Sequence, residues 1–78
     1  MYTVYAIKSK IGNYIYVGLT SNLNERLNRH NSGYEKTTRA YAPFNLIFSE
    51  DFQSKVEART KEKYFKSGVG KEFLKKIK

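Results

Sequence analysis

Two short tripeptides, Thr3-Val4-Tyr5 and Tyr16-Val17-Gly18, decide how this chain folds. The segments around them, residues 2–8 and 14–18, are rich in β-branched and aromatic residues, which favours strands. The Gly12-Asn13 pair between the segments is typical of a hairpin turn. Because side chains alternate along a strand and hairpin strands lie side by side, the sequence predicts that the two tyrosines can come close together.

A helix is expected directly after the hairpin. A capping-box pattern begins at Asn22, and Gly33 is a typical helix stop, so the helix should lie between these residues. At about 3.6 residues per turn, Arg26 and His30 lie on the same arc as the two leucines of this helix. We therefore expect both polar side chains on or beside the face that meets the sheet.

Three more elements are predicted after a polar loop at residues 34–43. A third strand is expected at residues 44–49, where Phe44, Leu46 and Phe48 alternate. A capping box opens a second helix from Ser54 to about Ser67, which should stop at the following glycine. A short final helix is expected where apolar residues recur at helical spacing, at Phe73, Leu74 and Ile77.

The element order β-β-α-β-α-α predicts an α+β fold, with a small, three-stranded, mostly antiparallel sheet flanked by helices. We assign residues 1–78 to a single domain, because 78 residues are too few for a second domain. The chain has no cysteine, which excludes a disulfide framework and a zinc-thiolate site. No apolar run approaches the roughly 20 residues of a membrane span, so we expect a soluble, cytoplasmic monomer.

The formal net charge of +8 is large for a chain of this length. Such a charge favours a polyanionic partner, because phosphates that bind basic side chains release their condensed counterions. A merely soluble surface, or a non-catalytic protein, is the alternative explanation. The charge alone therefore favours nucleic acid without indicating any chemistry.

Arg26, His30 and Glu62 follow the two tripeptides and form, with Tyr5 and Tyr16, a set of polar residues in a specific order. This set resembles the GIY-YIG nuclease family, and most closely its small stand-alone members; it is also similar to the N-terminal nuclease domain of the bacterial excinuclease and to homing endonuclease catalytic domains. Two strand substitutions separate the chain from the signature, Thr3 for glycine and Val17 for isoleucine. No asparagine follows Asn45, whereas many members carry a late one. The residues that carry the resemblance are Tyr5, Tyr16, Arg26, His30 and Glu62.

The resemblance implies a metal-dependent endonuclease that hydrolyses DNA phosphodiester bonds, in DNA repair or recombination. It assigns Glu62 as the ligand of Mg²⁺ or Mn²⁺, five residues after Glu57 as in the family. A hard cation accepts one or two carboxylates together with waters and substrate phosphate, so a single glutamate suffices. The alternative is a surface ion pair between Glu62 and Lys66, worth a few tenths of a kcal/mol.

The resemblance assigns catalytic roles to four more residues. Arg26 offers a planar fork for a phosphate, although its stem could also simply cover the sheet. His30 could orient a water or a tyrosine or take its proton, or it could be an ordinary half-buried histidine. Tyr5 and Tyr16 would prepare the attacking water, but a phenol has a pKa near 10 and needs help from a neighbour. Which tyrosine acts is left open, and both could serve only in packing.

The loop at residues 34–43 is the candidate nucleic-acid surface. Its two aromatic and two basic side chains could stack on bases and bind phosphates, a signal shared by many basic loops. This interpretation favours DNA over RNA as the partner. The loop residues concerned are Tyr34, Lys36, Arg39 and Tyr41.

Two rival hypotheses belong to other classes of protein. The first is a nucleic-acid-binding module on the same fold with little or no cleavage activity. The second is a basic domain that binds only protein. Charge fits both nucleic-acid readings equally, whereas only an enzyme needs a carboxylate at Glu62.

Overall fold

The computed structural model describes residues 1–77, and the predicted order of elements and the α+β class are confirmed. A short 3₁₀ helix, Arg39–Tyr41, interrupts the loop before the third strand. All strand pairs are antiparallel, and β1 lies in the middle of the sheet order β2-β1-β3. The strands and helices are β1 (Tyr2–Ser9), β2 (Ile15–Thr20), α1 (Leu23–Asn31), β3 (Phe44–Phe52), α2 (Lys55–Lys66) and α3 (Gly68–Lys75).

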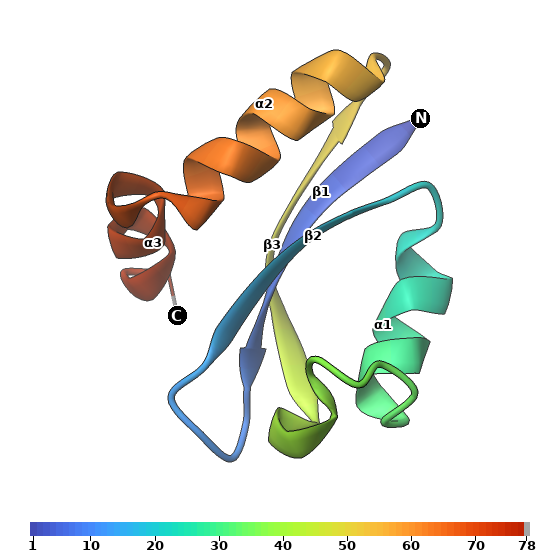
Figure 1. The fold of residues 1–78 in the computed structure, drawn as a ribbon, viewed down its shortest axis with the longest axis vertical. Coiled ribbons are helices and arrows are strands. Elements are labelled where there is room, and N and C mark those ends of the chain that lie inside the picture. Colours follow the sequence, from blue (N-terminus) through green and yellow to red (C-terminus); the bar gives the residue numbers. More distant parts are fainter. Residues whose placement is uncertain (78) are drawn as a thin grey trace.

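The sheet is covered on both faces, by α1 on one side and by α2 and α3 on the other (Figure 1). As the central strand, β1 is buried on both faces, which explains its run of apolar residues without polar alternation. Val4 and Ala6 pack toward α2 and α3, against Phe65 among others. Tyr5 and Ile7 point the other way and form the core beneath α1. The chain thus has two small cores, one on each face of the sheet.

The strict alternation expected in the third strand is wrong, because β3 contains a bulge. Phe48 and Leu46 pair with consecutive residues of β1, so Ile47 is an extra residue in β3. Strict alternation would place Phe44 and Phe48 on one face, but the extra residue sends them to opposite faces: Phe44 packs in the core beneath α1, and Phe48 packs against the other core. β3 therefore contributes an aromatic residue to each core, and it continues to Phe52.

The helix caps follow the sequence pattern. The backbone N–H of Glu25 donates to the side chain of Asn22, so α1 begins where predicted, and Gly33 follows its end with a φ of 81°. In α3 the prediction needs correction, because the helix begins at Gly68, the residue expected to end α2, and stops at Lys75. Ile77 therefore lies beyond the helix, although it still packs against the core. Within residues 1–77, no helix is both long and apolar enough to cross a membrane.

The crossing of α2 and α3 depends on Gly70. A Cβ atom at this buried position would overlap the backbone carbonyl of Tyr64. We expect Gly70→Ala to lower the free energy of unfolding by about 1 to 3 kcal/mol, as overpacking does, even though alanine favours the helix by about 1 kcal/mol. Gly68→Ala is the matched control, because no atom lies within 4 Å of a Cβ there. Thermal and urea unfolding of both variants would test this, and equal stabilities would contradict it.

Candidate active site

Tyr5 reaches the centre of the α1 face because the strand beside it carries a glycine. Gly18 of β2 is the register partner of Tyr5, and a Cβ atom at Gly18 would lie 2.5 Å from the Tyr5 hydroxyl. The phenol ring therefore crosses β2 over Gly18. This contact gives a physical reason why the second tripeptide ends in glycine: any larger residue would displace the Tyr5 side chain.

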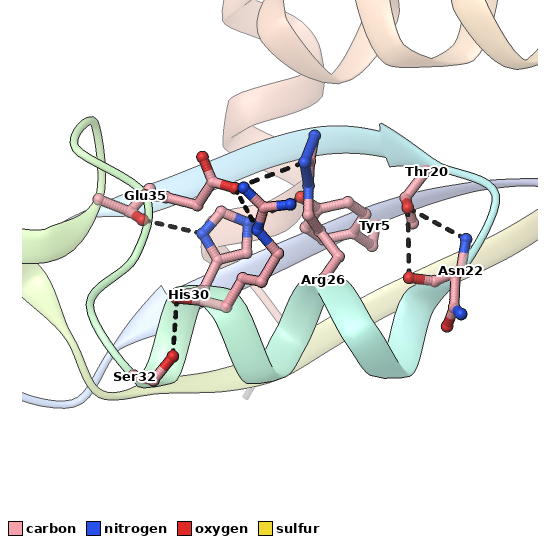
Figure 2. Close-up of polar contacts among 9 residues, drawn as sticks. Tyr5, Thr20, Asn22, Arg26, His30, Ser32 and Glu35 are labelled. Carbon is pink, nitrogen blue, oxygen red and sulfur yellow. Dashed lines mark hydrogen bonds and ion pairs between the residues drawn. The ribbon is translucent and has the colours of Figure 1, made fainter.

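Two buried hydrogen bonds connect three elements beneath α1. The Tyr5 hydroxyl and His30 Nε2 are 2.8 Å apart, and His30 Nδ1 lies 2.8 Å from Thr38 Oγ1. The exposed fractions of these residues are 0% for Tyr5, 1% for His30 and 0% for Thr38. Figure 2 shows the imidazole between α1 and the phenol of β1. Tyr5 and His30 are thus brought together as predicted, but both lie out of direct reach of solvent.

Tyr16 lies at the border between this buried cluster and the surface. It is partly exposed, and its ring centroid is 5.0 Å from that of His30 and 6.3 Å from that of Tyr5. Burial, and then the nearby Tyr16, raise the pKa of Tyr5 above its usual value, so Tyr5 keeps its proton at neutral pH. Of the two tyrosines, Tyr16 is the one that an external molecule can approach.

Burial also lowers the pKa of His30, which makes the stability of the protein depend on pH. The unfolded chain then takes up a proton at a higher pH than the folded chain. The contribution of neutral His30 to the free energy of unfolding is fully present above the unfolded pKa of about 6.5, and it is lost as pH falls through the lowered folded pKa. We expect melting temperatures to fall over this range. An NMR titration of His30 that gives a pKa at or above 6.5 would contradict the prediction.

Arg26, on α1, lies near Tyr5 and has an acidic partner that the sequence did not predict. Arg26 Nη1 lies 3.5 Å and Arg29 Nε 3.1 Å from the same oxygen of Glu35, which follows α1 (Figure 2). The side chain of Arg26 is 33% exposed. Its Nε is nevertheless buried without a hydrogen-bond partner among residues 1–77. Oε1 of Glu35, although it forms these ion pairs, likewise has no hydrogen-bond partner in this part of the chain. Because buried polar groups are ordinarily hydrogen-bonded, the unpaired donor on this cation is consistent with an anion that completes the site.

The carboxylate of Glu35 competes with any phosphate for Arg26. We expect Glu35→Gln to tighten DNA binding by up to about fivefold, because partly exposed ion pairs are worth about 0.2 to 1 kcal/mol. Glu72→Gln removes the same charge from a pair with Lys75 on α3 and serves as the control. Fluorescence anisotropy with labelled DNA would compare the two variants. Equal tightening would show that net charge alone is responsible.

Glu62 lies apart from the α1 face, at the edge of the sheet formed by β2. It lines a cavity of about 350 Å³ together with Thr20 and Arg59, where β2 leaves the sheet. Its side chain is 17% exposed, and Oε2 pairs with Lys66 at 3.3 Å, so the ion pair considered as an alternative does form. Glu62 is still near enough to Tyr5 to contribute to the raised pKa of that phenol.

The oxygen donors at this edge fit a hard divalent cation. No cluster of three or more histidine, cysteine or acidic side chains that could hold a metal occurs within residues 1–77. Mg²⁺ does not require such a cluster, because it commonly binds one or two carboxylates and keeps several waters. The largely buried carboxylate of Glu62 opens onto a cavity and could be the one protein ligand that such an ion needs.

The loop residues have different surroundings. Lys36 and Arg39 are exposed, and Tyr34 is 77% exposed. Tyr41 is 39% exposed, but its ring stacks on Tyr14 with centroids 4.2 Å apart and an interplanar angle of 13°. One face of the Tyr41 ring is therefore already covered, and Tyr34 is the freer aromatic side chain for contact with a base.

Two residues near the site were absent from the sequence prediction. Glu35 had a weak signal, because it is the single acid between Arg26 and Arg39. Thr38 had none, since a threonine in a polar loop is ordinarily exposed. Its burial follows from the fold of the loop, where its N–H donates to the carbonyl of Glu35 and its own carbonyl accepts from the N–H of Tyr41.

Residues 1–77 match the family model of the GIY-YIG catalytic domain. The chain therefore belongs to the GIY-YIG family, and the resemblance carried by the two tripeptides is confirmed.

The relatives found are UPF0213 proteins. The chain is 42% identical over 64 residues to a UPF0213 protein of Streptococcus pneumoniae, a match that covers 81% of this chain and 64% of the relative. It is 41% identical over 63 residues to the UPF0213 protein YazA of Bacillus subtilis, covering 80% and 63% of the two chains. These two matches thus span less than two thirds of each relative's own length. The solution NMR structure of a UPF0213 protein from Bacillus halodurans is similar with a TM-score of 0.57 at 36% identity, covering 95% of this chain and 82% of the other.

Proposed function

We propose that the protein is a metal-dependent endonuclease that hydrolyses phosphodiester bonds in DNA. The observation that carries this proposal is the partly exposed guanidinium of Arg26, which lies near Tyr5 and whose Nε has no hydrogen-bond partner among residues 1–77. Arginine at this place can bind a phosphate through two N–H groups and stabilise the charge that develops during hydrolysis. The nuclease-type domain of the family supports the same assignment.

Tyr16 and Tyr5 have different roles in this proposal. Tyr16, which is accessible, orients the attacking water and accepts its hydrogen bond. Tyr5 and His30 are buried, so they act through Tyr16 and Arg26 rather than by touching the substrate. The raised pKa of Tyr5 supports this division, because a phenol that holds its proton firmly is a poor general base.

Glu62 is the residue that would hold Mg²⁺ or Mn²⁺, together with waters and a phosphate oxygen. When bound, such an ion supplies Lewis-acid chemistry that neutralises phosphate charge and acidifies water. Within the chain, Glu62 must exchange its ion pair with Lys66 for this role. That exchange costs little, because a partly exposed pair contributes at most about 1 kcal/mol.

DNA is the proposed partner, and the net charge of +8 supports it. Lys36 and Arg39 on the exposed loop would bind phosphates, and Tyr34 would stack on a base. Tyr41 would contact the nucleic acid with the face of its ring that Tyr14 leaves uncovered. If about three to five phosphates are neutralised, log affinity should fall against log salt with a slope of roughly −3 to −4.5 for duplex DNA.

A nucleic-acid-binding module without cleavage is the second candidate. One observation favours it: Glu62 is already paired with Lys66. A panel of duplex, nicked, flapped and single-stranded DNA and RNA, with Mg²⁺, Mn²⁺ or chelator, separates the two functions. The endonuclease predicts metal-dependent cleavage of at least one DNA. Salt-sensitive binding of the whole panel with no cleavage would instead support the module.

A further inference from the structure

We propose that Thr38 is a positioning residue that fixes the tautomer of His30, so that Nδ1–H donates to Thr38 and Nε2 accepts the hydroxyl proton of Tyr5. Its effect on turnover rests on the proposed nuclease function, whereas the tautomer itself does not. The inference gives a role to a buried loop hydroxyl that neither the tripeptides nor the family match would indicate.

Two hydrogen bonds form a buried, linear chain from Tyr5 through His30 to Thr38. Both distances from the imidazole are 2.8 Å, and all three residues are at most 1% exposed. The backbone of Thr38 is held on both sides, since its N–H donates to the Glu35 carbonyl at 3.2 Å and its carbonyl accepts from the Tyr41 N–H at 2.9 Å. Thr38 is therefore held in place by the turn, and its hydroxyl is a fixed partner for His30 Nδ1.

The chemistry of the two hydroxyls selects the tautomer. A neutral imidazole has one N–H donor and one bare nitrogen acceptor, so His30 can donate to only one of its two neighbours. A phenol is a stronger acid than an aliphatic alcohol and hence the better donor, while the alcohol oxygen is the better acceptor. The favoured arrangement therefore runs from the Tyr5 hydroxyl to Nε2, and from Nδ1–H to the Thr38 oxygen.

The opposite tautomer has a specific cost. With the proton on Nε2, the imidazole would donate to the Tyr5 oxygen, and the Tyr5 O–H would need another acceptor. His30 is the only hydrogen-bond partner that the Tyr5 hydroxyl has within residues 1–77. In the favoured tautomer the Thr38 O–H is likewise without an acceptor among residues 1–77. A buried hydroxyl proton without an acceptor is destabilising, and the cost is larger for the more acidic phenol than for the alcohol. Thr38 therefore works against the opposite tautomer by giving Nδ1–H a partner.

The consequence for the site is the direction of the Tyr5 proton. With Nε2 as acceptor, this proton points inward, and the phenol presents only oxygen lone pairs to its other neighbours. Tyr16 and Arg26 are among the groups whose charges act on Tyr5. Thr38 thereby keeps Tyr5 as an acceptor toward the residues that meet the substrate. Loss of the hydrogen-bond partner of a metal-bound histidine typically costs about 10- to 100-fold in activity, and we expect an effect on this scale for the partner of His30.

The direct test is imidazole ¹⁵N NMR, because the chain contains one histidine and its signals need no assignment. On tag-free protein above pH 7, we expect Nδ1 to resonate as a protonated nitrogen and Nε2 as an unprotonated one. Thr38→Ser keeps the hydroxyl and should preserve this pattern. Thr38→Val keeps the shape without the hydroxyl and should shift the signals toward the other tautomer. A protonated Nε2 in the wild type, or an unchanged pattern in Thr38→Val, would overturn the inference.

Turnover provides the second readout. Thr38→Val should lower the single-turnover cleavage rate by about 10-fold or more with DNA affinity unchanged, and Thr38→Ser should restore it. Thr37→Val, at the exposed neighbouring threonine, is the control and should match the wild type. If Thr38→Val does not fold, the wild-type tautomer still decides, because a protonated Nε2 refutes the inference. If the wild type cleaves nothing, the nuclease proposal fails while the NMR result stands independently.

Discussion

Replacing Glu62 by glutamine is expected to reduce metal-dependent cleavage by at least about 10²-fold, the scale seen when one electrostatic stabiliser of a transition state is removed. The amide is nearly isosteric but carries no charge for a divalent cation. DNA affinity should be preserved or rise slightly, because one negative charge leaves the region of the phosphate. Stability should change little, since the lost pair with Lys66 is partly exposed.

Glu57→Gln is the matched control for this result. Glu57 lies on the same helix, is exposed, and carries the same charge. Single-turnover rates and anisotropy titrations on both variants separate the metal site from a general charge effect. Cleavage by Glu62→Gln at the wild-type rate would reduce Glu62 to a surface residue and would refute the metal assignment.

Replacing Tyr16 by phenylalanine should lower the turnover rate by roughly 10²-fold or more, as loss of a group that handles the proton of the water does. The ring can still pack beside His30, so the fold should survive. Tyr5→Phe should behave differently, because Tyr5 is fully buried and its hydroxyl bonds to His30. We expect this variant to lose about 1 to 1.5 kcal/mol of stability and a smaller factor in rate.

Tyr14→Phe is the internal control, because Tyr14 lies in the same core two residues from Tyr16 and stacks on Tyr41. It should cleave at nearly the wild-type rate. Rates of the three variants, with thermal melts to detect unfolding, decide between the tyrosines. A larger loss in Tyr5→Phe than in Tyr16→Phe would reverse the roles proposed for them.

The element order was predictable because its signals are local. The cap at Asn22, the stop near Gly33 and the β-branched and aromatic residues around Tyr5 are signals that depend on residues close in sequence, and each has its counterpart in the structure. The bulge at Ile47 was not predictable in this way. It is decided by how β3 meets β1, a pairing between segments far apart in the chain.

In the candidate site, too, some features were predictable from the sequence and others depend on the folded structure. The spacing of Tyr5, Tyr16, Arg26 and His30 was enough to predict that they gather on one face of the sheet, as they do. Their differences in burial were not predictable, because these depend on how deeply each position lies under α1. Thr38 was missed for a related reason: only the folded loop carries its hydroxyl beneath the helix to His30.

The most direct test of the central claim is single-turnover cleavage by the wild-type protein in excess over labelled DNA, at a salt concentration where anisotropy shows the DNA fully bound. The proposed endonuclease predicts that product accumulates with Mg²⁺ and stops when excess chelator is added, while the DNA remains bound. Fully bound DNA that stays intact with both Mg²⁺ and Mn²⁺, for every structure in the panel, would contradict the account.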